Sequence, residues 1–263
     1  MMTGAGTPAD RIPILMYHSI SPERGPTSIA PDLFTAQMQA IVDAGWNVAP
    51  LAAYAGWRLR GETLPQRTLV ITFDDAYQNF ADTAFPILSQ HGFPATVFVP
   101  TALSGGIAAW PGAHEPHRAI MAWGTIRKLA AKGIEFAPHS RTHANLAALD
   151  SETLQLEIAG SKQDIEDRLG APARHFAPPY GHTSPAADAM IAANYEISVG
   201  VELGIARRTS PQHAAPRLEM LYYSDVRRWK SFLSGTGDAY LFARQCARAA
   251  RRLLVPSAAA QYS

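Results

Sequence analysis

Two adjacent aspartates end a short apolar run that is typical of a buried strand. The run is Thr-Leu-Val-Ile-Thr-Phe at residues 68–73, and Asp74 and Asp75 follow it. Neighbouring carboxylates repel each other and are costly to desolvate unless a cation or hydrogen-bond donors compensate them. The pair therefore favours metal binding and proton transfer, one carboxylate holding an ion and its neighbour taking a proton if the chain turns there. For the dipeptide alone, an Asp-rich turn is the alternative.

A second apolar run, residues 134–138, leads into two histidines four positions apart, His139 and His143. On one helical turn this spacing puts both imidazoles on the same face, where they can reach one divalent ion. Two histidines and one carboxylate form a ligand set that leaves positions open for water and substrate. Two polar loop histidines are the alternative.

A third segment, His-Phe-Ala-Pro-Pro-Tyr-Gly-His at residues 175–182, has the composition of a short strand entering a rigid loop. Pro179 stiffens the backbone and Gly181 allows a tight turn. The loop would present Tyr180, whose backbone N–H or phenol can donate to a developing oxyanion. Taken alone, the pattern is also an ordinary turn.

The elements that must position these residues are short apolar strands alternating with segments of helical period. Seven strands are one short of the eight-fold ideal, so the sequence predicts an α/β fold with a distorted or incomplete (β/α) barrel of about seven parallel strands. A doubly wound sheet is the alternative; in both, working residues follow the C-terminal ends of strands. The expected strands are 12–17, 46–49, 68–73, 95–99, 134–137, 175–177 and 197–200, and the expected helices 32–44, 81–91, 125–132, 151–169 and 185–194.

The order of the three segments resembles the NodB-homology polysaccharide deacetylases, carbohydrate esterase family 4. The family's Thr-Phe-Asp-Asp motif matches residues 72–75, and its His-Ser/Thr-x-x-His-x-x-Leu motif matches residues 139–146. Its Pro-Tyr-Gly motif matches Pro179, Tyr180 and Gly181. The resemblance covers roughly residues 12–200, and the first two motifs together are specific.

The resemblance implies a role for each matched residue. Asp74 would be the general base, and Asp75, His139 and His143 would hold a divalent metal, usually zinc and sometimes cobalt or nickel. The metal and a backbone N–H near Tyr180 would stabilise the oxyanion as water attacks the acetyl group.

Two departures from the family pattern leave roles unassigned. Ala177 stands where the family carries an arginine that orients the catalytic aspartate, so Arg174 or Arg217 would have to supply the guanidinium. The late Leu-x-His motif of the general acid has no match. His213 and His18 are the candidates for that acid, and His18 directly follows the first expected strand.

Composition sets the class of protein and excludes some partners. Hydrophobic residues make up 47% of the 263 positions and the formal net charge is +1, which indicates one globular domain over residues 1–263 without a general attraction for nucleic acid. The sequence predicts neither a signal peptide nor a membrane span, and we expect a cytoplasmic protein.

Residues 218–263 are expected to form a helical extension packed on the domain. Its helix at 238–254 carries Arg244, Arg248, Arg251 and Arg252 beside apolar residues. Such a helix can make peripheral contact with the inner face of a membrane, or can be the charged outer face of a packed helix.

Substrate recognition should use aromatic rings, on which sugar faces stack. Trp110 is the main candidate, in an insert at residues 104–116, together with Trp123, Tyr77 and Tyr180. The predicted function is removal of an N-acetyl group from an amino sugar, carrier-linked or oligomeric, in exopolysaccharide or glycolipid biosynthesis. Hydrolysis of an O-acetyl group or a non-sugar amide, or glycan binding with weak catalysis, are the alternatives.

Overall fold

The structure is a computed structural model that describes residues 9–23, 25, 27–110 and 118–254. Seven strands form one parallel sheet in the order β8-β7-β6-β2-β12-β10-β9. Its two edge strands approach each other where the N–H of Ala177 donates to the carbonyl of Pro138 at 3.3 Å. The sheet is thus a nearly closed barrel, and the prediction of an incomplete barrel of seven parallel strands is confirmed. The barrel strands are β2 (Ile14–Tyr17), β6 (Thr68–Phe73), β7 (Thr96–Val99), β8 (Glu135–Pro138), β9 (His175–Phe176), β10 (Ile197–Leu203) and β12 (Ala215–Glu219).

The prediction of the strands needs two corrections. The segment at 46–49 forms only β5 (Asn47–Val48), which pairs with the first half of β6, on the edge that β7 occupies further along. It therefore stays outside the barrel path. The seventh barrel strand is β12, which was not expected, and the C-terminal extension begins after Glu219 rather than at residue 218. The remaining strands are short: β1 (Arg11–Ile12) pairs with β11 (Ala206–Arg207), and β3 (Ser19–Ile20) with β4 (Ser28–Ile29).

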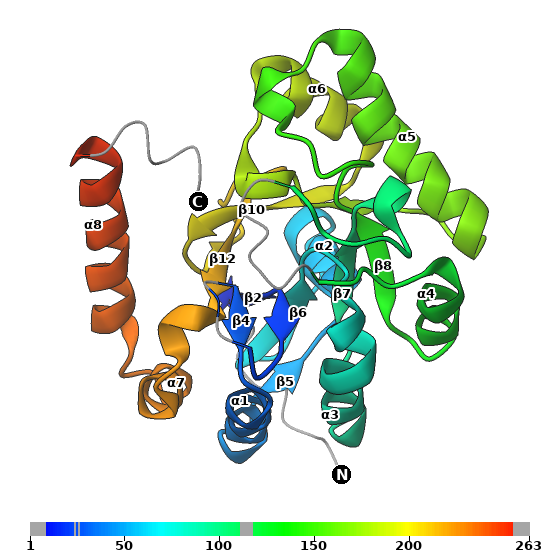
Figure 1. Ribbon diagram of the computed structural model, residues 1–263. Helices are drawn as coiled ribbons and strands as arrows, with labels where there is room; N and C mark the ends of the chain where they lie inside the picture. The colour runs from blue at the N-terminus through cyan, green and yellow to red at the C-terminus, as the bar shows by residue number, and fades with distance from the viewer. Residues whose placement is uncertain (1–8, 24, 26, 111–117, 255–263) are drawn as a thin grey trace.

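Helices surround the strands, and Figure 1 shows α5 and α6 together at one end of the molecule. The longest, α5, begins after Asp150, whose carboxylate accepts the N–H of Thr153 at 2.8 Å, and it ends at Gly170 with a φ of 67°. Asp150 rather than the neighbouring serine is thus the N-cap. The helices are α1 (Pro31–Asp43), α2 (Leu51–Leu59), α3 (Phe85–Gln90, preceded by a π-helix at Phe80–Ala84), α4 (Trp123–Ala130), α5 (Ser151–Leu169), α6 (Pro185–Asn194), α7 (Val226–Leu233) and α8 (Asp238–Leu254).

The barrel interior is an apolar cluster to which every barrel strand, or the residue directly after it, contributes a side chain. These are Ile14, Val70, Phe98, Ala137, Ala177, Val199 and Ala215, all buried. Leu51, Tyr54 and Trp57 of α2 belong to the same cluster. Because side chains on a strand alternate between its faces, the residues two and four positions further along face the same interior.

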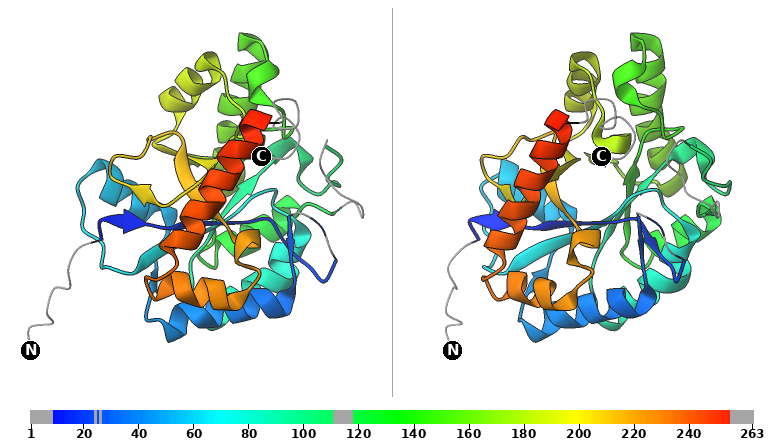
Figure 2. Two further views of the ribbon diagram at one scale, coloured as in Figure 1. Left: turned by 90° about the vertical axis from the view of Figure 1, so that its left-hand side faces the viewer. Right: turned by 60° about the vertical axis from the view of Figure 1, so that its left-hand side comes forward.

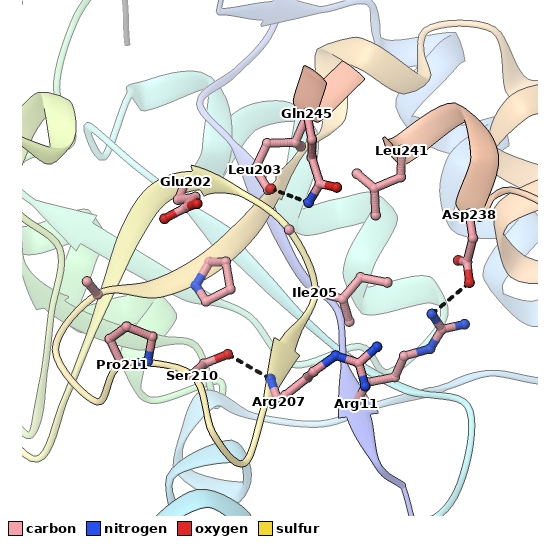
Figure 3. A pocket seen from close by; sticks show the side chains of 13 residues that line it. Arg11, Glu202, Leu203, Ile205, Arg207, Ser210, Pro211, Asp238, Leu241 and Gln245 are labelled. Carbon is pink, nitrogen blue, oxygen red and sulfur yellow. Dashed lines mark hydrogen bonds and ion pairs between the residues drawn. The ribbon is translucent and has the colours of Figure 1, made fainter. Parts of the chain in front are cut away.

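The C-terminal helix α8 lies at the side of the barrel, and Figure 2 brings it to the front. Asp238 pairs with Arg11 at 2.9 Å, and the Gln245 side chain donates to the Leu203 carbonyl at 2.8 Å. A hollow of about 410 Å³ lies between these two attachments, shown in Figure 3. Leu241, which lines this hollow, is buried in the core, so the helix is attached by these polar contacts and by apolar packing.

The basic side chains of α8 do not all face outward. The Arg244 guanidinium lies 3.9 Å from the centre of the Tyr222 ring, on the barrel side, whereas Phe242 is 67% exposed. Contact of α8 with a membrane stays a prediction, and the side chains of residues 252–254 lie outside the described part. Among the described residues, no helix combines the length and apolar character needed to cross a membrane.

Candidate active site

Three predicted site residues that follow barrel strands lie at one end of the barrel, on the face of each strand that points to the interior. Asp74 lies four residues beyond Val70, His139 two beyond Ala137, and His18 four beyond Ile14, so all three follow the interior face. Each also lies just past the C-terminal end of its strand. The rule that working residues follow strand ends therefore places them correctly.

Asp74 is held by the arginine that sequence reasoning left unassigned. The two guanidinium nitrogens of Arg217 donate to the two oxygens of Asp74 at 2.7 Å each. The same guanidinium donates to Thr72 Oγ1 at 3.1 Å and to the carbonyl of Gly200 at 2.7 Å, and its side chain is fully buried. Arg174, the other candidate, pairs instead with Glu196 at the surface.

The guanidinium keeps the Asp74 carboxylate ionised inside the barrel. Burial alone would raise the pKa of Asp74, but Arg217, with smaller contributions from His139 and His18, outweighs it and lowers the pKa. Asp74 is thus a carboxylate at neutral pH, as a general base must be.

Asp75, His139 and His143 lie together, all three buried, with ligand atoms within 4.8 Å of one another. Nε2 of His139 and Nε2 of His143 lie 3.6 Å and 3.1 Å from Oδ1 of Asp75. Oδ1 is buried and accepts no well-aligned hydrogen bond, although two ring nitrogens face it. A carboxylate and two imidazoles that converge in this way fit a divalent cation such as Zn²⁺ or Co²⁺.

The protonation of these groups also suits a metal. Nδ1 of His139 donates to the Ala177 carbonyl at 2.6 Å, which leaves Nε2 as the free lone pair facing Asp75. Burial lowers the pKa of His139 to about 4, so the ring is neutral. Burial by itself would raise the pKa of Asp75. Interactions with His143, His18 and His139 outweigh burial, and the pKa of Asp75 is lowered.

Several residues of the site have a left-handed backbone conformation. This conformation sets the positions of their side chains, which the sequence predicted only in part. The expected turn at the aspartate pair is present, with φ of 72° at Asp75. The histidines, by contrast, do not share a helical turn: residues 139–143 form a loop with φ of 59° at both Ser140 and His143. The loop brings the rings together by the path of its backbone rather than by helical spacing. Five of the six non-glycine residues with positive φ in the described chain lie here: Asp75, Ala76, Ser140, His143 and Tyr180.

Trp110 lies in the site and stacks against protein rings. It stacks on His143 with ring centroids 4.0 Å apart, and on Tyr77 at 6.3 Å. These stacking contacts with protein rings leave less of the indole surface available to a sugar than the sequence suggested. The rest of the insert, residues 111–116, lies outside the described part. Trp123 lies at the start of α4 with Arg168 over its ring, and contributes no contact to the cluster.

The Pro179–Gly181 turn carries Tyr180 to the edge of the His143 ring, with centroids 4.7 Å apart. Gly181 has a φ of 68°, and a Cβ there would lie 2.3 Å from a methyl group of Val201, so only glycine fits. Burial, with Asp75 nearby, raises the pKa of Tyr180 to about 12. The phenol therefore stays a hydrogen-bond donor at neutral pH.

The two candidates for the general acid lie in different surroundings. Nε2 of His18 is 3.9 Å from Oδ2 of Asp74, and the His18 side chain is 16% exposed. His213 lies just before the first residue of β12, whereas His18 follows the last residue of β2. Burial lowers the pKa of His213, and the nearby Asp188 of α6 partly opposes this shift. Among the described residues, the structure brings His18 to Asp74 and shows no contact between His213 and the cluster.

Comparison with known proteins gives a consistent result. The polysaccharide deacetylase family matches residues 61–198. YxkH of Bacillus subtilis, provisionally named a polysaccharide deacetylase, is 25% identical over 211 residues, which are 80% of this chain and 71% of that protein. A chitooligosaccharide deacetylase of Rhizobium leguminosarum is 31% identical over 100 residues, covering 38% of this chain but only 40% of that protein. Among solved structures, the Streptococcus pyogenes deacetylase PplD in complex with acetate superposes with a TM-score of 0.71 at 26% identity, covering 81% of this chain and 93% of that one.

Proposed function

The chain belongs to the polysaccharide deacetylase family, and on that basis we propose that it is a metal-dependent hydrolase that removes the N-acetyl group of an amino sugar. We propose a carrier-linked or oligomeric glycan precursor as its substrate. The observation that supports this most directly is the buried Asp75, His139 and His143 cluster beside a carboxylate that Arg217 keeps ionised. Metal-assisted attack of water on an acetamide uses both features.

Each part of the site has a task in this reaction. The divalent ion, when bound by Asp75, His139 and His143, supplies Lewis acidity toward the acetyl carbonyl and the attacking water. Asp74 takes a proton from that water while the oxygen of the water forms a bond to the carbonyl carbon. The backbone N–H or phenol of Tyr180 donates to the carbonyl oxygen as its negative charge grows. His18 gives a proton to the sugar nitrogen as the C–N bond breaks, so that acetate and a free amine are the products.

Acetate release should depend on a divalent metal. We expect purified protein to release acetate from at least one of a nucleotide-linked, a lipid-linked and an oligomeric N-acetylhexosamine when Zn²⁺ or Co²⁺ is added, and not after chelation. Asp75→Ala should abolish the activity because it removes the carboxylate ligand. Tight metal binding without acetate from any of the three would contradict the proposal and favour glycan binding or a non-sugar substrate.

His18→Gln should lower kcat on an N-acetyl sugar by about 10²-fold, the usual contribution of a general acid. The loss should be much smaller on an O-acetyl ester of the same sugar, because an alkoxide leaves with less need of a proton than an amine. His213→Gln is the matched control and should leave kcat unchanged, since His213 has no contact with the cluster. Equal losses for the two variants, measured by acetate release, would refute the assignment to His18.

A further inference from the structure

The segment between the two histidine ligands is held in an unfavourable backbone conformation. Ser140 and His143 both have φ of 59°, a left-handed region that is strained for a non-glycine residue. A loop of this kind keeps its shape only when its surroundings over-determine it. The contacts of Arg141 and Thr142, the residues in the middle of the loop, show what does so.

A single carboxylate on α5 accepts three hydrogen bonds from the middle of this loop. Glu157 Oε2 accepts the backbone N–H groups of Arg141 and Thr142 at 2.8 Å and 2.9 Å. Its Oε1 accepts the hydroxyl of Thr142 at 2.7 Å. Glu157 is only 6% exposed, so water cannot easily replace these bonds.

The same face of α5 fixes the Arg141 side chain and the neighbouring turn. Asp164, two turns beyond Glu157, accepts Nε of Arg141 at 3.0 Å and the hydroxyl of Thr101 at 2.6 Å. Between them stands Gly160, where a Cβ would lie 3.0 Å from Cδ of Arg141. Helix α5 is thus shaped to accept the loop closely, with Glu157 at the point nearest the two ligands.

We propose that Glu157 is a positioning residue for the metal centre. Its carboxylate holds the 139–143 loop in its left-handed path, so that Nε2 of His143 and Nε2 of His139 converge on Asp75 before any ion arrives. This inference rests on the proposed function, in which those three residues bind a divalent ion. Groups that orient the ligands of a metal typically contribute about 10- to 100-fold to metal affinity.

Metal affinity, measured apart from catalysis, tests this role. The metal-free wild type, Glu157→Gln and Glu166→Gln are titrated with CoCl₂ and with ZnCl₂ by calorimetry, and the Co²⁺ spectra are recorded. Glu166 is the matched control because it is also on α5 and also accepts a backbone N–H, that of Ala173 at 3.1 Å, yet it has no contact with the loop. We expect Glu157→Gln to weaken Co²⁺ binding at least about tenfold, and Glu166→Gln to change it less than about twofold.

Melting of the metal-free proteins separates positioning from general stability. A similar fall in Tm for both glutamine variants, with weaker metal binding only in Glu157→Gln, supports the proposal; equal metal affinities overturn it. If Glu157→Gln does not fold, Thr142→Val removes only the Oγ1 bond to Glu157 and should weaken Co²⁺ binding about two- to tenfold. In that case unchanged affinity in Thr142→Val overturns the inference. If the wild type itself binds neither ion, the proposed function fails and this inference with it.

Discussion

Asp74→Asn should lower kcat for acetate release by about 10²- to 10⁴-fold, and the protein should still bind a divalent ion. The substitution preserves the shape of the side chain but removes the base that takes the proton from water. Asp75→Asn is the comparison, because it changes the neighbouring carboxylate and should lose the metal as well as the activity. Calorimetric titration with Zn²⁺, alongside the acetate assay, distinguishes the two outcomes.

Asp74→Asn should also cost stability, since it leaves the Arg217 guanidinium buried without its counter-charge. Rates must therefore be compared at temperatures where the variant is folded, as judged by circular dichroism. An Asp74→Asn protein as active as the wild type would show that another group is the base.

Arg217→Met should destabilise the protein by about 3–5 kcal/mol near neutral pH, because it leaves the Asp74 carboxylate buried without a partner. Without the guanidinium, burial raises the pKa of Asp74, so the acidic limb of the kcat profile should move to higher pH and kcat at neutral pH should fall at least about tenfold. Urea denaturation and a pH–rate profile measure both effects.

The sign of the pH effect on stability follows from the same ion pair. In the wild type the pKa of Asp74 is lowered by folding, so its contribution is present above the pKa of the unfolded chain and is lost as pH falls through the folded value. The destabilisation by Arg217→Met should therefore shrink at acid pH. Arg174→Met is the control: its pair with Glu196 is at the surface, and its loss should cost less than about 1 kcal/mol. A stability loss in Arg217→Met no larger than in Arg174→Met would contradict the assigned role.

The site residues could be predicted best where an apolar strand is followed directly by residues that can bind a metal or transfer a proton. The runs before Asp74 and His139, Leu-Val-Ile-Thr-Phe and Ile-Glu-Phe-Ala, are mainly large and apolar, so both the strands and their ends can be recognised. Strand β12 could not be recognised in this way, because Ala-Pro-Arg-Leu-Glu contains a proline and two charged residues. Arg217 pairs with the buried Asp74, so the charge that gives β12 its place in the site also hides the strand from a hydrophobic pattern.

Two local features of the site also depend on tertiary contacts. The path of the 139–143 loop follows from hydrogen bonds with Glu157, which is 14 residues beyond His143 in the chain. The stacking of Trp110 between His143 and Tyr77 joins three separate segments. Spacing indicated that the two histidines act together, but it could not give the backbone conformation that unites them.

The place of β12 in the sheet also has a consequence for biosynthesis. This strand lies inside the sheet, between β2 and β10, but it is the last barrel strand in the chain. The other six barrel strands are therefore translated before it. Until Arg217 is inserted, the Asp74 carboxylate has no counter-charge and must stay hydrated, which opposes closure of the interior around it. Because domains form as their chain is synthesised, we expect the closing of the barrel and the neutralisation of its buried charge to occur together, late in synthesis. A ribosome-bound chain that stops before residue 215 should accordingly carry both the Asp74-Asp75 pair and the two histidines of the cluster, and no activity.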